Sequence, residues 1–346
     1  MCFVRISKYL FIVMILCVFS ATDSYAQNCW LGKLFKKKVK VVEMETIKVD
    51  TAFHMDMSGP FFLAISPDIP DQVSFCGQKI DLHKTDMRER FDREMLSMMY
   101  MHSSTLLLLK RANRFFPVIE PILKANGVPD DFKYLACIES NLDPRAISSA
   151  RAVGMWQFMS ETAVQYGLEV NEDVDERYHV EKETEAACKY LKNAYSKFKD
   201  WVTTAASYNA GTSKITKELE RQKENTSFNL WLVEETNRYV FRILACKTFL
   251  ENPRKYGFRI KKEQLYMPYV SKDTIVTGKV PNWVDFAKNQ GISYYDLKTY
   301  NLWIRNDSLE NAGGKAYKVS IPLKESLYFN KDKITVHQKN WATDEN

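Results

Sequence analysis

Apolar residues follow a helical period over most of the middle of the chain. The first stripe is made of residues three and four positions apart, namely Met87, Phe91, Met95 and Met98. Such spacing predicts one buried helical face. Pro117 and Pro121 interrupt the apolar stretch that follows, and we expect them to break or kink its helix. The pattern assigns residues 81–127 to a helical lead-in, after a tether over residues 27–80.

The densest helical signals lie between residues 128 and 256. A helix is expected to begin at Pro129, because proline is tolerated in a first turn and the two acids that follow favour a helix N-terminus. A second helix has one apolar face, made of Ala187, Tyr190, Leu191, Ala194 and Phe198. A third should stop at Gly211, and a fourth should span about 228–251. This region is therefore predicted to be a mainly helical domain.

The pattern changes after Pro253. Short strands are predicted at 274–277 and 317–321, and short helices between them at 283–288 and 295–300. Together they indicate a compact β-α-α-β unit, assigned to residues 265–323. The tail, residues 324–346, is polar and expected to be loose. The helical domain is accordingly expected to fold without residues 265–346.

The first 26 residues are typical of a secretory signal. A basic start precedes an uncharged apolar run, and the small residues around Ala26 suit a signal peptidase. The run is shorter than the ~20 residues of a membrane span. We expect cleavage and export to the periplasm or cell envelope. A lipid anchor on Cys17 or Cys29, and with it membrane association, is the alternative.

Net charge, cysteine spacing and histidine spacing argue against nucleic-acid binding, a disulfide framework and a metal site. The formal net charge of +6 is spread along the chain, which does not indicate nucleic-acid binding but would suit an anionic polymer. Five cysteines follow the signal at irregular spacing, which is a poor disulfide framework. Cys137, Cys188 and Cys246 fall in helical patterns and are expected to be buried free thiols. The histidines have no metal-ligand spacing, so neither a metal nor another cofactor is predicted.

One carboxylate stands where an apolar face predicts a buried residue. Phe132, Leu135, Ala136 and Glu139 share one side of the helix that begins at Pro129. Charged residues are rarely buried without a partner, and raising a glutamate pKa from ~4.3 to ~6 costs about 2 kcal/mol. Periodicity alone leaves open a solvent-facing glutamate, or one paired with a nearby arginine.

Four ordered motifs begin at this glutamate and follow it along the sequence. They are Glu139-Ser140, Gly154-Met155-Trp156-Gln157, Ser207-Tyr208-Asn209 and Glu235-Thr236-Asn237-Arg238-Tyr239-Val240. Over about residues 110–252 they resemble family 1 lytic transglycosylases, the membrane-bound D-type branch best. The family patterns are E-S, G-L-M-Q or G-L-W-Q, A-Y-N and E-T-x-x-Y-V, so Met155 and Ser207 depart from them. The resemblance implies a mainly α, α+β lysozyme-like fold of the goose-lysozyme type.

The resemblance also implies a reaction. Glu139 would protonate the oxygen of the MurNAc-GlcNAc β-1,4 bond in peptidoglycan glycan strands, and then act as the base. The muramic 6-hydroxyl would attack internally, which gives a 1,6-anhydromuramic end without water. Ser148 would place a hydroxyl near the N-acetyl group. No protein partner can be inferred.

The remaining implied roles lie around the glycan groove. Gln157 and Met159 would line its floor beside the glutamate. Tyr208 and Asn209 would position the N-acetyl group and orient the glutamate. Tyr239 would contact the catalytic region from the long helix, although a plain packing role is equally compatible with its spacing.

Two rival functions remain open at this point. A true lysozyme would use water and a second carboxylate, for which Asp143, Asp173 and Asp175 are the nearest candidates. A non-catalytic cell-wall scaffold would keep the groove but should have lost some of the motif residues.

The C-terminal β-α-α-β unit resembles a degenerate LysM repeat, a small glycan-binding module. The likeness rests on several positions, namely Gly278, Trp283, Phe286-Ala287, Gly291-Ile292-Ser293, Asp296-Leu297, Asn301 and Tyr317-Val319-Ile321. Lys279-Val280-Pro281 replaces the usual acidic-threonine pair. Glycan binding and a structural role are therefore both open for this unit.

Overall fold

The computed structural model describes residues 65–343, which all belong to one compact unit. The expected signal, most of the tether and Cys29 lie outside the described residues. None of the helices in the described part is long and apolar enough to cross a membrane. Cys137, Cys188 and Cys246 are buried free thiols, as predicted.

A β-hairpin precedes the first described helix. Strand β1 (Gln72–Phe75) pairs antiparallel with β2 (Gln78–Asp81). Phe75 is fully buried, and its ring meets the Phe132 ring edge-on at 5.5 Å between centroids. The tether predicted over 27–80 was therefore wrong at its C-terminal end, because this aromatic contact fixes the hairpin to the helical core. Helix α2 (Thr85–Tyr100) follows; it buries Met87, Phe91 and Met95 of the predicted stripe, and Met98 is half-buried.

We expected Pro117 and Pro121 to break or kink helix α3 (His102–Ala125), and the helix runs through both without a break. Each proline removes one backbone hydrogen bond. The same helix buries Phe116, Ile119 and Leu123 completely. Packing of this apolar face offsets the lost hydrogen bonds, because tertiary burial supplies most of the stability of helices in proteins.

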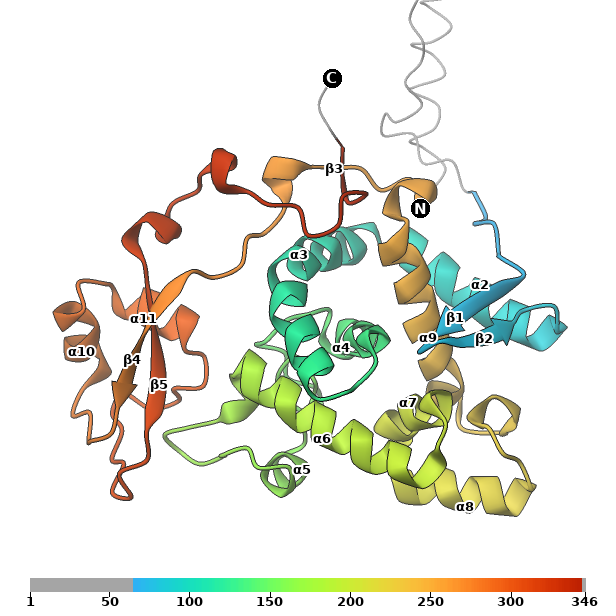
Figure 1. The fold of residues 1–346 in the computed structure, drawn as a ribbon, viewed down its shortest axis with the longest axis horizontal. Coiled ribbons are helices and arrows are strands. Elements are labelled where there is room, and N and C mark those ends of the chain that lie inside the picture. Colours follow the sequence, from blue (N-terminus) through green and yellow to red (C-terminus); the bar gives the residue numbers. More distant parts are fainter. Residues whose placement is uncertain (1–64, 344–346) are drawn as a thin grey trace, which may run out of the picture. The chain divides into compact units, whose positions relative to one another are not determined.

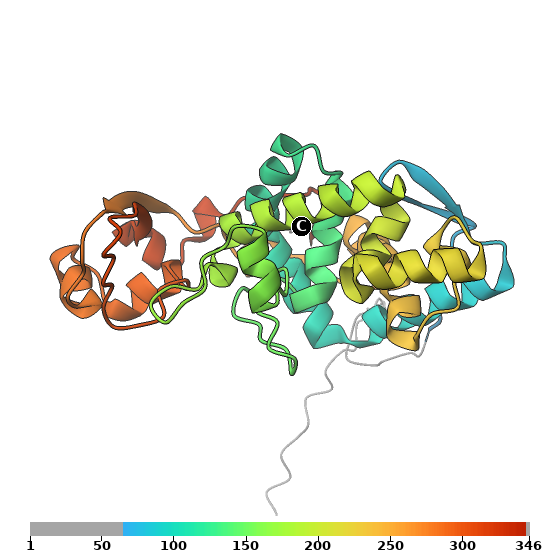
Figure 2. The same ribbon diagram turned by 90° about the horizontal axis from the view of Figure 1, so that it is seen from below.

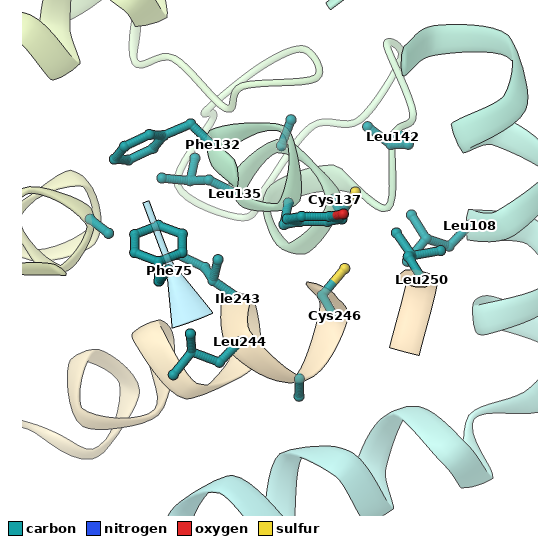
Figure 3. Packing of buried hydrophobic residues seen from close by; sticks show 14 of the residues in the cluster. Phe75, Leu108, Phe132, Leu135, Cys137, Leu142, Ile243, Leu244, Cys246 and Leu250 are labelled. Carbon is teal, nitrogen blue, oxygen red and sulfur yellow. The ribbon is translucent and has the colours of Figure 1, made fainter. Parts of the chain in front are cut away.

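Helix α4 (Lys133–Ser140) lies at the centre of the helical domain (Figure 1). The one-turn helix η3 (Asp130–Phe132) precedes it, and α4 packs against the long helix α9 (Glu234–Glu251). Figure 3 shows this interface, with side chains of η3 and α4 facing those of α9, among them Phe132, Leu135, Cys137, Ile243, Leu244 and Cys246.

The other helices enclose this pair. They are α5 (Ser160–Gln165), η4 (Glu176–Tyr178), α6 (Val180–Phe198), α7 (Trp201–Ala210), α8 (Thr212–Gln222) and η5 (Ser227–Asn229). Asp200 caps the N-terminus of α7, because its carboxylate accepts the N–H of Thr203 at 2.9 Å. It ends at Gly211 with φ 84°, as predicted.

The C-terminal unit has the predicted β-α-α-β order and its own core. Strands β4 (Ser271–Val276) and β5 (Tyr317–Pro322) pair antiparallel, and between them lie α10 (Trp283–Asn289) and α11 (Tyr294–Tyr300). The mainly α fold class with a small β-α-α-β unit is thus confirmed. Three short elements connect this unit to α9, namely η6 (Pro253–Tyr256), β3 (Ile260–Lys261) and η7 (Lys262–Gln264).

A loop of the helical domain reaches into the core of the C-terminal unit (Figure 2). Val174 is fully buried there and forms a β-bridge with Ile304. The N–H of Arg305 donates to the Asp173 carbonyl at 2.8 Å, and the Asn306 amide donates to the Asp173 carboxylate at 3.0 Å. The two domains therefore share one buried apolar contact with polar contacts around it.

The described part of the tail, residues 324–343, packs back on the helical domain, so the loose tail predicted for 324–346 was wrong over these residues. After the short helices η8 (Lys324–Leu327) and η9 (Lys331–Lys333), strand β6 (Ala342–Thr343) pairs parallel with β3. The Trp341 side chain is fully buried, and its Nε1 donates to the Leu250 carbonyl at 2.7 Å. The helical domain therefore loses part of its core if residues 265–346 are removed.

Replacing Trp341 tests this correction. Trp341→Ala is expected to lower the free energy of unfolding by about 3–5 kcal/mol, because it leaves a cavity and an unpaired carbonyl. Phe329, which is 75% exposed, supplies the control, and Phe329→Ala should change stability by less than about 0.5 kcal/mol. Chemical denaturation measures both. Equal stabilities of the two variants would show that the tail is loose after all.

Candidate active site

Glu139 lies in the last turn of α4, with its carboxylate largely removed from water. The helix ends directly after it, because Asn141 adopts a left-handed conformation with φ 55°. The neighbouring hydroxyl of Ser140 donates to the Met155 carbonyl at 2.9 Å, which ties the end of α4 to the loop that follows. Glu139 is half-buried, so its carboxylate can reach a ligand and is still largely removed from water.

Tyr239 of α9 holds the carboxylate in place. Its buried hydroxyl donates to Oε1 of Glu139. One turn further along α9, the guanidinium of Arg242 donates to the Ile138 carbonyl at 3.1 Å. Within residues 65–343, the side-chain hydrogen bond to the Glu139 carboxylate comes from Tyr239. Helix α9 therefore both orients the acid and brings a positive charge near it.

The environment of Glu139 is suited to proton transfer. Burial, which penalises the charged form, raises the pKa of Glu139 from 4.5 to about 7. The Tyr239 hydrogen bond and the Arg242 charge act against this rise in pKa, whereas the negative charge of Glu235 adds to it. A group with a pKa near the ambient pH can both donate and accept a proton.

The loop from Gly154 to Gln157 forms a rigid turn beside α4. Gly154 has φ 88°, and a Cβ there would lie 1.8 Å from the Arg177 carbonyl oxygen, so no other residue fits. The Gln157 amide donates to the Gly154 carbonyl at 2.7 Å and thus closes the turn. The Tyr208 hydroxyl donates to the Trp156 carbonyl at 2.8 Å, which fastens the loop to α7.

Glu183 supports the same loop from α6 and was not singled out in the sequence. It is fully buried, and its carboxylate accepts the backbone N–H groups of Met155 and Trp156, both at 3.1 Å. Burial raises the pKa of Glu183, and these two hydrogen bonds oppose that rise. Its burial could have been predicted from the sequence, because Glu183 stands four residues before Ala187 on an apolar helical face.

Asn209 is clamped between the end of α7 and the start of α9. Its Nδ2 donates to the Glu235 carboxylate at 3.2 Å, and its Oδ1 accepts the Thr236 hydroxyl at 2.9 Å. The two partners fix which way the amide faces. The motif that contains Glu235 and Thr236 was recognised in the sequence, but the hydrogen bonds by which these two residues hold Asn209 were not predicted.

Five of the expected site residues, the already described Gln157 and Asn209 among them, make no hydrogen bond to Glu139 within residues 65–343. The Ser148 hydroxyl accepts the Ala152 N–H at 3.0 Å within its own turn. Met159 is exposed just before α5. Tyr208 was expected to orient Glu139, but its hydroxyl is taken by the Trp156 carbonyl; Tyr239 makes that contact instead.

The acids considered as a second carboxylate are occupied elsewhere. Asp143 pairs with Arg111 at 2.6 Å, and Asp175 pairs with Arg177 at 2.7 Å. Asp173 accepts hydrogen bonds from the C-terminal unit.

The role of Glu183 can be tested by a substitution that keeps its shape. Glu183→Gln removes one acceptor and turns an amide N–H toward a backbone N–H. Stability is therefore expected to fall by about 1–3 kcal/mol, with faster hydrogen exchange at the amides of Met155 and Trp156. Exposed Glu185 of the same helix provides the control, Glu185→Gln. If exchange at the two amides is the same in both variants, Glu183 does not hold the loop.

Comparison with known proteins places both domains. The family described as Transglycosylase SLT domain matches residues 116–230, and the Soluble lytic transglycosylase C-terminal LysM-like domain matches residues 272–325. The chain is similar to membrane-bound lytic murein transglycosylase D of Escherichia coli (strain K12), with 30% identity over 271 residues. That match covers 76% of this chain, which spans only 58% of the length of the relative.

Two solved structures are also similar over part of the chain. Lytic transglycosylase Slt from Pseudomonas aeruginosa, solved as an inactive mutant, is 21% identical with a TM-score of 0.34, over 39% of this chain and 23% of that one. The 70 kDa soluble lytic transglycosylase from Escherichia coli is 20% identical with a TM-score of 0.37, over 47% and 29%. It is the family matches that identify the two domains. Residues 116–230 form a transglycosylase SLT domain, and residues 272–325 form a LysM-like domain of the kind found at the C-terminus of soluble lytic transglycosylases.

Proposed function

We propose that this protein is a peptidoglycan lytic transglycosylase that cleaves the MurNAc-GlcNAc β-1,4 bond and leaves a 1,6-anhydromuramic end. The observation that carries the proposal is the environment of Glu139, a half-buried carboxyl at a helix end with its pKa raised to about 7 and a tyrosine hydroxyl on one oxygen. The SLT domain match and the similarity to a murein transglycosylase support the choice of substrate.

The reaction needs one proton carrier. Neutral Glu139 donates its proton to the glycosidic oxygen, and the bond from that oxygen to the muramic C1 breaks. The 6-hydroxyl oxygen of the same muramic ring then bonds to C1, and its proton returns to Glu139. The products are a 1,6-anhydro ring and a free 4-hydroxyl on the released sugar, and no water is consumed.

An internal nucleophile explains why one acid suffices. A tethered hydroxyl reacts at an effective concentration far above that of a free one, so no second carboxylate is needed to activate water. Asp143, Asp173 and Asp175 have other partners, which supports this reading over a hydrolase. Glu235 is exposed and its negative charge acts on Glu139, which makes it the candidate second carboxylate of the rival lysozyme-like reaction.

The remaining site residues have proposed roles around the sugar. Gln157 and Met159 line the groove floor, and Ser148 offers a hydroxyl near the N-acetyl group. Asn209 presents its clamped amide to the N-acetyl group. Tyr208 acts by holding the loop. These intact motif residues favour an enzyme over a non-catalytic scaffold.

We also propose that the protein works outside the cytoplasm, in the periplasm or cell envelope, after removal of residues 1–26. The substrate lies there, and the similar Escherichia coli protein is named as membrane-bound. A lipid anchor on Cys29 is the alternative to a freely diffusing form. The domain limits proposed are 128–256 for the catalytic domain and 265–323 for the LysM-like domain.

Glu139→Gln tests the mechanism directly. It keeps the shape but cannot carry the proton, so turnover of purified sacculi should fall about 10²- to 10⁴-fold while the fold survives. Wild-type products should be muropeptides lighter by one water than hydrolysis products, measured by mass spectrometry. Exposed Glu220 provides the control, Glu220→Gln. Full activity of Glu139→Gln contradicts the mechanism, and reducing ends as the main product would indicate a hydrolase.

A further inference from the structure

A large aromatic side chain without an assigned role is exposed in the segment that leads into α9. The segment between α8 and α9 is extended, and its side chains alternate between core and solvent. Leu230 and Leu232 are buried, whereas Trp231 is 84% exposed and Val233 is 54% exposed. The indole of Trp231 therefore contributes little to the core, although it is one of the largest apolar groups on the surface.

One side chain, that of Gln222, bonds to both backbone polar groups of Trp231. At the end of α8, Oε1 of Gln222 accepts the Trp231 N–H at 2.8 Å, and Nε2 of Gln222 donates to the Trp231 carbonyl at 3.1 Å. Glu218 in turn accepts from Gln222 at 2.7 Å. The indole is thus presented on a fixed segment, so little conformational entropy is lost when a ligand contacts it.

Trp231 borders a shallow hollow whose lining residues lie close in sequence to Asn209 and to the residues that clamp it. The hollow has a volume of about 250 Å³ and is lined by Lys214, Glu218, Trp231, Leu232 and Val233. One wall belongs to α8, a helix that begins three residues after Asn209. The other wall leads directly into α9, whose second residue bonds to Asn209. One wall therefore lies just before the two α9 residues that clamp Asn209, and the other wall belongs to the helix that begins three residues after Asn209.

We propose that this hollow is a further subsite for the glycan strand, in which one sugar ring lies flat against the Trp231 indole. The proposal rests on the proposed function. A pyranose ring has an apolar face of C–H groups, which suits a rigid exposed indole with an apolar body and one polar N–H. The exposed ammonium of Lys214 stands at the same hollow. It can pair with the carboxylate of a muramyl peptide.

The subsite predicts a strong dependence on strand length. With the full chain and soluble glycan strands of defined length, Trp231→Ala is expected to raise KM about 3- to 10-fold on long strands, with a smaller rise on the shortest cleavable fragment. Trp231→Phe should recover most of the loss. Tyr328, which is 77% exposed on the tail, supplies the matched control, and Tyr328→Ala should behave as wild type.

Other outcomes overturn the proposal in distinguishable ways. Identical kinetics of Trp231→Ala and wild type on long strands would show that the hollow binds no sugar, while the proposed function stands. Absence of glycan cleavage by the wild type would remove the proposed function itself. Unchanged kinetics combined with lost binding to phosphatidylglycerol vesicles would assign Trp231 to a membrane surface instead.

Discussion

The packing of α4 against α9 is the contact on which the rest of the molecule depends. It buries the apolar face that ends in Glu139, and it also brings the Tyr239 hydroxyl onto that carboxylate. Burial and hydrogen bonding act on the pKa in opposite directions. Burial has the larger effect, so the acid remains protonated close to neutral pH while the tyrosine fixes its direction. One helix pair thus sets both the position and the proton affinity of the proposed catalytic group.

The other helices hold the surroundings of that pair. Helix α6 supplies Glu183, which accepts two backbone N–H groups of the loop beside α4. Helix α7 supplies Tyr208, whose hydroxyl donates to a carbonyl of the same loop. It also supplies Asn209, whose amide bonds to the start of α9. Each contact uses a side chain to fix backbone or another polar side chain, so the surroundings of Glu139 do not depend on loop conformation alone. In the proposed subsite, the extended segment with Trp231 presents its exposed indole to the glycan.

Features that repeat locally could be predicted from the sequence, and those that depend on distant contacts could not. The stripe of α2 and the stop at Gly211 follow from periodicity and local backbone chemistry. Glu139 and Tyr239 could be placed by motif. The burial of Trp341 could not, because its partner carbonyl, that of Leu250, lies 91 residues away in the sequence. Likewise, the helix through Pro117 persists because of tertiary packing, which no local rule contains.

Direct titration of Glu139 tests the central claim, that burial against α9 makes this carboxyl a proton donor near neutral pH. Carbon-13 NMR of labelled glutamate side chains, assigned with Glu139→Gln, gives the midpoint in the wild type and in Tyr239→Phe. The account predicts a wild-type midpoint near 7. It predicts a higher midpoint in Tyr239→Phe, because the lost hydrogen bond stabilised the ionised form. A wild-type midpoint near 4.5, the ordinary value, would contradict the account; so would a lower midpoint in the variant.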